Sequence, residues 1–92
     1  EKFYLSQNYP NPFNSSTRIN YQLPKKSHVK IQIFNTLGQE IKMLVDTEQS
    51  AGYYSLHWDG RNNNGIPVVS GIYIYKILSY NFNCTKKMIV IR

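Results

Sequence analysis

The sequence has few of the features that mark membrane, disulfide-rich or metal-binding proteins. Its longest unbroken apolar runs, residues 72–75 and 88–91, are four residues long, whereas a membrane-spanning helix needs about 18 or more. A single cysteine, Cys84, can form neither an internal disulfide nor, by itself, a thiolate metal site. The chain starts at Glu1 and shows no basic segment followed by an apolar one, so we expect no signal peptide and no transmembrane segment in it.

Acidic residues are also few, and the charge is strongly positive. Five Asp and Glu oppose eleven Lys and Arg, which gives a net charge of +6. A basic chain attracts polyanions, but the only adjacent basic pairs are Lys25-Lys26 and Lys86-Lys87. The aromatic residues show none of the Gly, aromatic and basic pattern of RNA-binding β-domains. A solvated surface is therefore favoured, and no nucleic-acid partner is expected.

Groups that carry catalysis or bind metals are scattered along the chain. The carboxylates are Glu1, Glu40, Asp46, Glu48 and Asp59, and none lies in a recognisable acid/base motif. The two histidines, His28 and His57, lack zinc-ligand spacing and are interpreted as surface residues. Cys84 has no His or Asp nearby in sequence to activate it and is interpreted as an inert thiol. The sequence therefore predicts a protein without enzymatic activity, bound metal or cofactor.

Apolar and polar residues alternate with a period of two through most of the chain. In Thr17–Leu23, for example, Ile19 and Tyr21 alternate with polar neighbours, as in a half-buried strand. Residues 72–78 are apolar on both faces except at Lys76, which is typical of a central strand. Strands are expected at residues 17–23, 29–34, 41–45, 53–59, 72–78 and 82–91, with a short extended stretch at 67–69.

Turn-forming residues separate these strands about every ten residues, and no window of helical period is longer than about one turn. Leu37-Gly38 and residues 47–52 are two of the expected turns. Six or seven such strands predict an all-β, antiparallel β-sandwich, with closure into a barrel as the alternative. The chain is too short for two folding units. We expect a single domain in which residues 1–16 form an extended entry segment and residues 17–92 form the sandwich.

The strongest turn signal lies at residues 59–65, where Asp59, Gly60 and Gly65 flank a run of Asn. These residue types tolerate positive φ, so a tight, exposed turn is expected. Asp and Asn before a glycine also occur in calcium-binding loops. The register does not fit that reading, because taking Gly65 as the sixth position puts Gly60 first and Gly71 twelfth, where such loops need carboxylates.

Trp58 is the expected centre of the core, because it shares one strand face with Tyr54 and Leu56. The other face of that strand is the polar one. Tyrosines also occupy positions 53, 54, 73, 75 and 80. They are interpreted as core on one face and cross-strand packing on the other. A surface that stacks on sugars or peptides is the alternative for them.

Five motifs follow one another along residues 5–92: LSQNYPNPFN from Leu5, FNTLGQE from Phe34, WDG from Trp58, SGIY from Ser70 and KKMIVIR from Lys86. In this order and spacing they resemble the type A C-terminal sorting domain of the type IX secretion system. One departure is Ser15, where that family often has proline. Cys84 is not a feature of the family.

The resemblance implies a seven-stranded immunoglobulin-like sandwich without catalytic activity, fused to the C-terminus of a cargo protein. In the family, the domain directs cargo that has reached the periplasm through an outer-membrane translocon. A sortase-like protease then removes the domain in many members. The implied partners are thus the translocon, sortase-like components and the fused cargo. The implied location is the cell surface or the medium.

The resemblance also implies which residues carry the sorting motifs. They are Pro10, Asn11, Pro12 and Phe13 in the opening motif, Gly71 and Tyr73 in the penultimate strand, and Lys86, Lys87, Met88 and Val90 in the terminal motif. Part of this pattern has a structural reason, since proline is disfavoured in central strands and glycine permits a bend before a buried strand. The fold also resembles the immunoglobulin-like domain of flagellar hook-capping proteins. A structural or adhesive module is therefore the alternative function.

Overall fold

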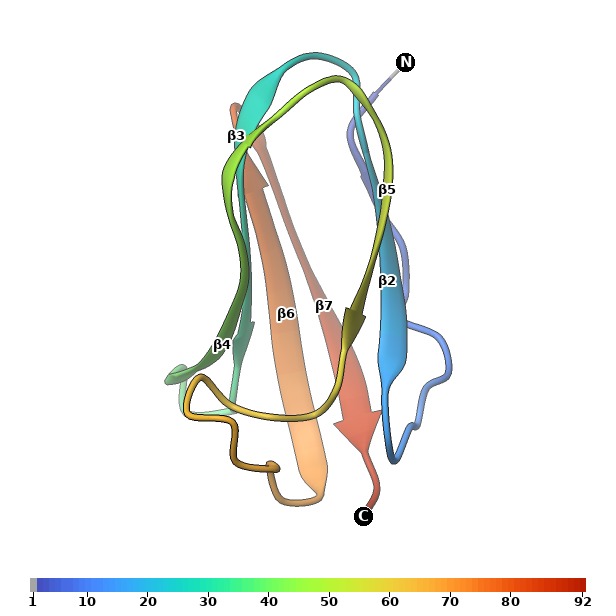
Figure 1. Ribbon diagram of the computed structural model, residues 1–92, viewed down its shortest axis with the longest axis vertical. Helices are drawn as coiled ribbons and strands as arrows, with labels where there is room; N and C mark the ends of the chain where they lie inside the picture. The colour runs from blue at the N-terminus through green and yellow to red at the C-terminus, as the bar shows by residue number, and fades with distance from the viewer. Residues whose placement is uncertain (1) are drawn as a thin grey trace.

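Residues 2–92 are described by the computed structural model, and they contain seven strands and no helix. The strands are β1 (Tyr4–Leu5), β2 (Thr17–Leu23), β3 (Ser27–Phe34), β4 (Glu40–Gln49), β5 (Gly52–Trp58), β6 (Gly71–Ser79) and β7 (Phe82–Val90). They form one sheet in the order β1-β2-β5 and another in the order β4-β3-β6-β7, with antiparallel pairing throughout. The sheets are the two layers of a sandwich (Figure 1), which confirms the predicted all-β, immunoglobulin-like class rather than a barrel.

The period-two pattern of the sequence places alternate side chains in the space between the sheets. In β2, for example, Ile19, Tyr21 and Leu23 are buried, whereas Arg18, Asn20 and Gln22 face outward. β6 lies between β3 and β7, as expected for a strand that is apolar on both faces. Its inward residues Tyr73, Tyr75 and Ile77 are all buried. The two inner faces together form one core.

The boundaries of β4 differ from the expected ones. The strand continues beyond Val45 to Gln49 and includes part of the expected turn at residues 47–52. These polar residues pair with the first residues of β3, for example Thr47 with Val29. β4 is the edge of its sheet, so a polar strand end can stay solvated there. Residues 67–69 form no strand, although the backbone N–H of Val68 donates to the Gly60 carbonyl.

The expected entry segment packs against the sandwich along its length. β1 pairs with β2, and both Leu5 and Phe13 are buried in the core at 3% exposure. The side chain of Asn8 is buried as well, and its Nδ2 donates a hydrogen bond of 3.0 Å to Thr17 Oγ1. The segment is therefore part of the folded unit. Residue 1, the first residue of the expected domain, lies outside the described residues.

Trp58, at the end of β5, lies in the core with 1% of its surface exposed. Phe13 and Tyr73 pack edge to face against it, with ring centroids 5.7 and 6.0 Å away. The indole Nε1 donates a hydrogen bond of 2.9 Å to the carbonyl oxygen of Arg61. A buried indole N–H needs such an acceptor. The expected central position of Trp58 in the core is thus confirmed.

Replacing Trp58 with alanine is expected to lower the free energy of unfolding by about 3–5 kcal/mol, because it leaves a cavity beside Phe13 and Tyr73. Total stability for a domain of this size is about 5–15 kcal/mol, so the loss is severe. Urea denaturation followed by circular dichroism measures it. The control is Leu37→Ala, at a side chain that is 83% exposed, which should cost less than about 0.5 kcal/mol. Red-shifted emission from the single tryptophan of the folded wild type would contradict the prediction.

Tyr75, on β6, connects the core to the entry segment. Its side chain is fully buried, and its hydroxyl donates a hydrogen bond of 2.7 Å to the carbonyl oxygen of Ser6. Burial raises the pKa of Tyr75 to about 12, although a backbone contact at Asn8 acts in the opposite direction. The phenol therefore stays protonated in the folded state well above the pH at which a free tyrosine ionises.

We expect the domain to lose stability as the pH rises from about 10 to about 12. In this range Tyr75 ionises in the unfolded chain, where its pKa is about 10, but the folded state retains the proton up to about 12. The unfolded state binds fewer protons, so the free energy of unfolding falls with increasing pH. Urea midpoints across this range measure the decline. Tyr75→Phe should make it shallower, and an unchanged slope in that variant would assign the effect to other groups.

Candidate functional site

Four segments that are distant in the sequence meet at the end of the sandwich where β7 finishes, which we call the C-terminal pole. Figure 1 shows the loop before β2, the loop between β5 and β6, the start of β6 and the end of β7 together at this end. Val90 of β7 pairs with both Gly71 of β6 and Phe13 of the entry segment. Most of the expected sorting-motif residues belong to these segments. Lys86 and Lys87 lie further back along β7.

The entry segment lies along the outer edge of β7. The N–H of Phe13 donates to the carbonyl oxygen of Ile89 at 3.1 Å, and the N–H of Ile91 donates to the carbonyl oxygen of Phe13 at 2.8 Å. The N–H of Ile89 donates to Asn11 Oδ1 at 2.9 Å. An edge strand normally presents unpaired backbone groups to solvent. At the end of β7 these groups are satisfied by residues from the opening motif.

The sorting-motif candidates divide into a buried set and an accessible set. Phe13, Tyr73, Met88 and Val90 are buried, with exposed fractions between 0% and 6%. In the folded domain these four residues are part of the core. A partner can reach them only if the domain opens.

The accessible set consists of Pro10, Asn11, Pro12, Gly71 and Lys87, all of which are exposed. The peptide bonds before Pro10 and Pro12 are both cis. Lys86 is half-buried, because it lies on the face of β7 that also carries Met88. The two lysines therefore point to opposite sides of the sheet, as strand alternation predicts.

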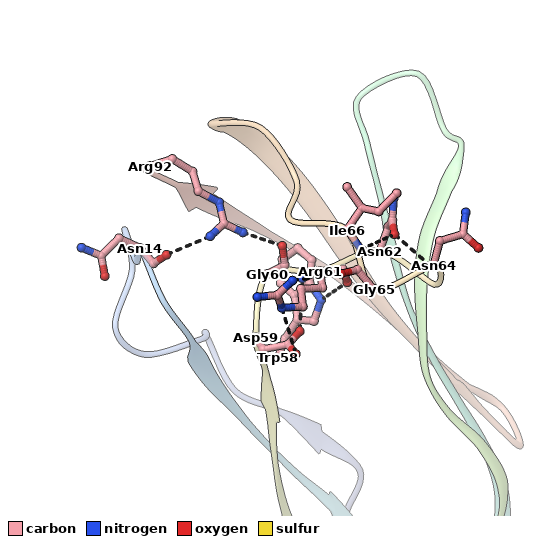
Figure 2. Close-up of polar contacts among 10 residues, drawn as sticks. All are labelled: Asn14, Trp58, Asp59, Gly60, Arg61, Asn62, Asn64, Gly65, Ile66 and Arg92. Carbon is pink, nitrogen blue, oxygen red and sulfur yellow. Dashed lines mark hydrogen bonds and ion pairs between the residues drawn. The ribbon is translucent and has the colours of Figure 1, made fainter.

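Arg92 connects the loop before β2 to the loop between β5 and β6, and Figure 2 shows its contacts with Asn14 and Gly60. Its guanidinium donates hydrogen bonds to the carbonyl oxygens of Val68, Gly60 and Asn14, at 2.8, 2.5 and 3.3 Å. Its backbone N–H donates to Ser70 Oγ at 2.8 Å. Sequence reasoning missed this role, although Arg92 belongs to the terminal motif. A planar guanidinium with several donors suits loop carbonyls that converge from different directions.

Residues 59–65 form the expected turn, and their side chains bond to their own backbone (Figure 2). Asn62 Oδ1 accepts hydrogen bonds from the N–H groups of Asn64 and Ile66, at 2.9 and 3.0 Å. Asp59 Oδ1 accepts one from the N–H of Arg61 at 3.1 Å. Side-chain oxygens of Asp59 and Asn62 are therefore bound to backbone donors of the turn itself. This arrangement is that of a structural turn.

The tyrosines serve more than one purpose. Tyr73 and Tyr75 are buried, and Tyr54 stacks on Tyr21 with ring centroids 5.1 Å apart. These contacts confirm the expected core, and the stack of Tyr54 on Tyr21 is cross-strand packing on the inward face. Tyr53, in contrast, is 81% exposed.

The remaining reactive side chains are dispersed over the surface. His57 is exposed, and His28 Nε2 lies 2.7 Å from Asp46 Oδ1 on an exposed part of β3 and β4. Cys84 is a half-buried free thiol packed against the core. Across residues 2–92, no group of three or more His, Cys, Asp or Glu side chains is placed to hold a metal ion, and no helix could span a bilayer.

Gly60→Ala is expected to destabilise the domain more than Gly65→Ala. The two glycines have similar φ values, 74° and 78°, at which an alanine costs about 1–2 kcal/mol. A Cβ on Gly60 would lie 2.5 Å from a guanidinium nitrogen of Arg92, whereas one on Gly65 meets nothing within 4 Å. The extra loss of stability in Gly60→Ala should disappear when each glycine change is made separately in a protein that also carries Arg92→Ala. Thermal denaturation of the variants measures this coupling. A difference between Gly60→Ala and Gly65→Ala that is as large in the Arg92→Ala background as in the wild type would contradict it.

Comparison with known proteins identifies the family of this fold. The family model of the FlgD Ig-like domain matches residues 7–81. A search of curated proteins finds no significant match. Solved structures with the same fold share a low sequence identity with this chain, so they show the fold alone.

Dimeric latent PorU from Porphyromonas gingivalis has a TM-score of 0.76 and 18% identity over 99% of this chain and 10% of its own. PorZ from the same organism has a TM-score of 0.62 and 19% identity over 98% of this chain and 11% of its own. FlgD from Xanthomonas campestris has a TM-score of 0.64 and 21% identity over 95% of this chain and 65% of its own. The chain thus spans about a tenth of PorU and PorZ and about two thirds of FlgD. Because the family model matches residues 7–81, the chain belongs to the FlgD Ig-like domain family.

Proposed function

We propose that this domain is a sorting signal of the type IX secretion system. It directs an N-terminally fused cargo protein from the periplasm through the outer membrane to the cell surface or the medium, and it acts by binding, without catalysis. The observation that carries the proposal is the pairing of the opening motif with the terminal motif. Hydrogen bonds between Phe13 and residues 89–91 join the opening motif to the terminal motif at the C-terminal pole. Motifs far apart in the sequence become one surface there.

The accessible part of this pole has the composition of a protein-docking surface. Val69, Ile72 and Ile91 have exposed fractions of 77%, 46% and 53%, and Ile72 pairs across the strands with Ile89, which is 40% exposed. Lys87 lies beside them on the same outer face of β7. Exposed apolar patches with a polar rim are typical of interaction sites. A translocon or sortase-like component is the partner that this reading assigns.

The structural comparisons support the proposal at the level of fold. PorZ, described as an essential bacterial surface component of the type IX secretion system, contains a segment with this fold. A shared fold does not carry a shared function. The functional part of the proposal therefore rests on the motifs and on their meeting at the C-terminal pole.

A second function is favoured by the family itself. FlgD from Xanthomonas campestris is described in terms of hook capping essential for flagellar assembly. The FlgD Ig-like family model covers most of this chain. Under this alternative the domain is a structural module of a surface protein or appendage. Its C-terminal pole then packs against neighbouring domains and is not recognised by the secretion machinery.

Export of a fused reporter in a bacterium with the type IX machinery tests the first proposal. Deleting residues 86–92 should abolish appearance of the reporter at the cell surface or in the medium. Lys87→Ala should lower export while leaving the melting temperature nearly unchanged, because exposed substitutions cost less than about 0.5 kcal/mol. Lys26→Ala removes the same charge from an exposed site between β2 and β3 and should not affect export.

Unfolding must be separated from loss of the signal, because the deletion removes buried Met88 and Val90 and the Arg92 hydrogen bonds. Leu23→Ala, at a buried side chain on the end of β2 away from Trp58, keeps the terminal motif and its packing intact but weakens the fold. If export follows the motif, this variant is exported better than the deletion at equal loss of thermal stability. A reporter exported normally after the deletion would contradict the sorting function and favour the structural module.

A further inference from the structure

The outer face of the β1-β2-β5 sheet carries a group of side chains that the proposed function does not use. Tyr4, Gln22 and Tyr53 lie directly opposite one another across the three strands. Tyr4 is 53% exposed and Tyr53 is 81% exposed. Side chains stand roughly perpendicular to a sheet, so the two phenols rise on either side of the Gln22 amide. Two strand spacings separate them at the backbone, which is about 9.5 Å.

The next rows of this face continue the same composition, and we call the whole surface the tyrosine face. Asn20 pairs with Ser55, and Arg18 pairs with both His57 and Tyr9. Tyr9 is 79% exposed. The Arg18 row lies four residues along β2 from the Gln22 row, which is about 13 Å.

A depression of about 520 Å³ lies at the Tyr4 end of the tyrosine face. Its lining includes the outward residues Tyr4, Asn20, Gln22, Tyr53 and Ser55. This volume is within the range of sites that bind small molecules, about 300–1,000 Å³. These five residues alternate with the core-facing residues of β1, β2 and β5, so the depression lies on the side of this sheet that faces away from the second sheet.

The chemistry of the tyrosine face distinguishes between classes of ligand. Among residues 4–58, the outward positions of β1, β2 and β5 hold tyrosine, amide, hydroxyl and basic side chains, with no aliphatic residue and no carboxylate. Protein interfaces are also enriched in tyrosine and arginine, but their centre is more apolar than this face, which holds no aliphatic side chain. A pyranose ring has an apolar face of C–H groups and a rim of hydroxyls. Tyrosine rings suit the former, and amide and hydroxyl side chains, which both donate and accept hydrogen bonds, suit the latter.

The charge of the tyrosine face and of the whole domain narrows the class of ligand further. Arg18 is exposed, and no carboxylate among residues 2–92 forms an ion pair with it. The domain carries a net charge of +6. A guanidinium binds a carboxylate through two parallel hydrogen bonds. An unpaired arginine at one end of a face without carboxylates is therefore complementary to an acidic sugar.

We propose that the tyrosine face binds an extended, β-linked polysaccharide that contains uronic acid units. The polysaccharide runs along β2. Tyr4 and Tyr53 flank a sugar ring above Gln22, Asn20 and Gln22 hydrogen-bond the hydroxyls, and Arg18, about 13 Å along the strand, pairs with a carboxylate of a later unit. This site lies on the sheet opposite to β7 and does not depend on the proposed sorting function.

Isothermal titration calorimetry of the 92-residue domain with the β-1,4-linked hexamer of mannuronic acid tests the proposal. Binding is expected, and it should weaken as salt is added. Tyr53→Ala and Arg18→Ala should each weaken binding at least about tenfold, as expected when a central contact residue is truncated. Both side chains are exposed, so both variants should melt like the wild type.

Matched controls separate sugar recognition from simple attraction between charges. Tyr80→Ala, at a tyrosine that is 70% exposed on another part of the molecule, and Lys26→Ala should bind like the wild type. Polyglutamate of equal charge should not bind. Chemical-shift changes on adding the hexamer to the wild type should fall on β1, β2 and β5, which tests the site without any variant.

Three results would overturn the proposal. The first is no heat of binding at millimolar hexamer. The second is binding that survives Tyr53→Ala or shifts resonances elsewhere. The third is equal binding of polyglutamate, which would indicate an acidic protein surface as the occupant.

Discussion

The packing of Phe13 and Tyr73 on Trp58 determines how the other parts of the structure are placed. Trp58 belongs to the three-stranded sheet and Tyr73 to the four-stranded one, so their contact joins the two layers. Phe13 brings the entry segment into the same cluster. Once Phe13 is buried, its backbone N–H and carbonyl lie beside β7 and pair with Ile89 and Ile91. The arrangement of the C-terminal pole therefore follows from one aromatic cluster.

Much of the fold could be predicted from the sequence because the alternation of residues such as Ile19 and Tyr21 depends only on strand geometry and burial. The length of β4 could not be predicted in this way. Residues 47–49 are polar and read as a turn, but they remain in a strand because β3 offers backbone partners. At such edges, backbone pairing with a neighbouring strand outweighs the turn propensity of the local sequence.

Only those parts of the candidate site that depend on local sequence rules could be predicted. Trp58 and the turn at residues 59–65 follow from local rules on apolar faces and positive φ. The role of Arg92 does not, because its acceptors are carbonyls of loops brought together only by the complete fold. The tyrosine face was hidden similarly, since Tyr4 and Tyr53 become neighbours only through their common partner Gln22.

The pairing of the entry segment with β7 also has a consequence for folding. Asn11 and Ile89, which share a hydrogen bond, are 78 residues apart in the sequence. This contact closes a loop that contains almost the whole chain, and the entropy of loop closure must be overcome before the contact contributes. Sandwiches dominated by such distant contacts fold in about milliseconds to seconds. A chain that emerges residue by residue, from a ribosome or from a pore, therefore lacks the assembled C-terminal pole until its last strand has followed.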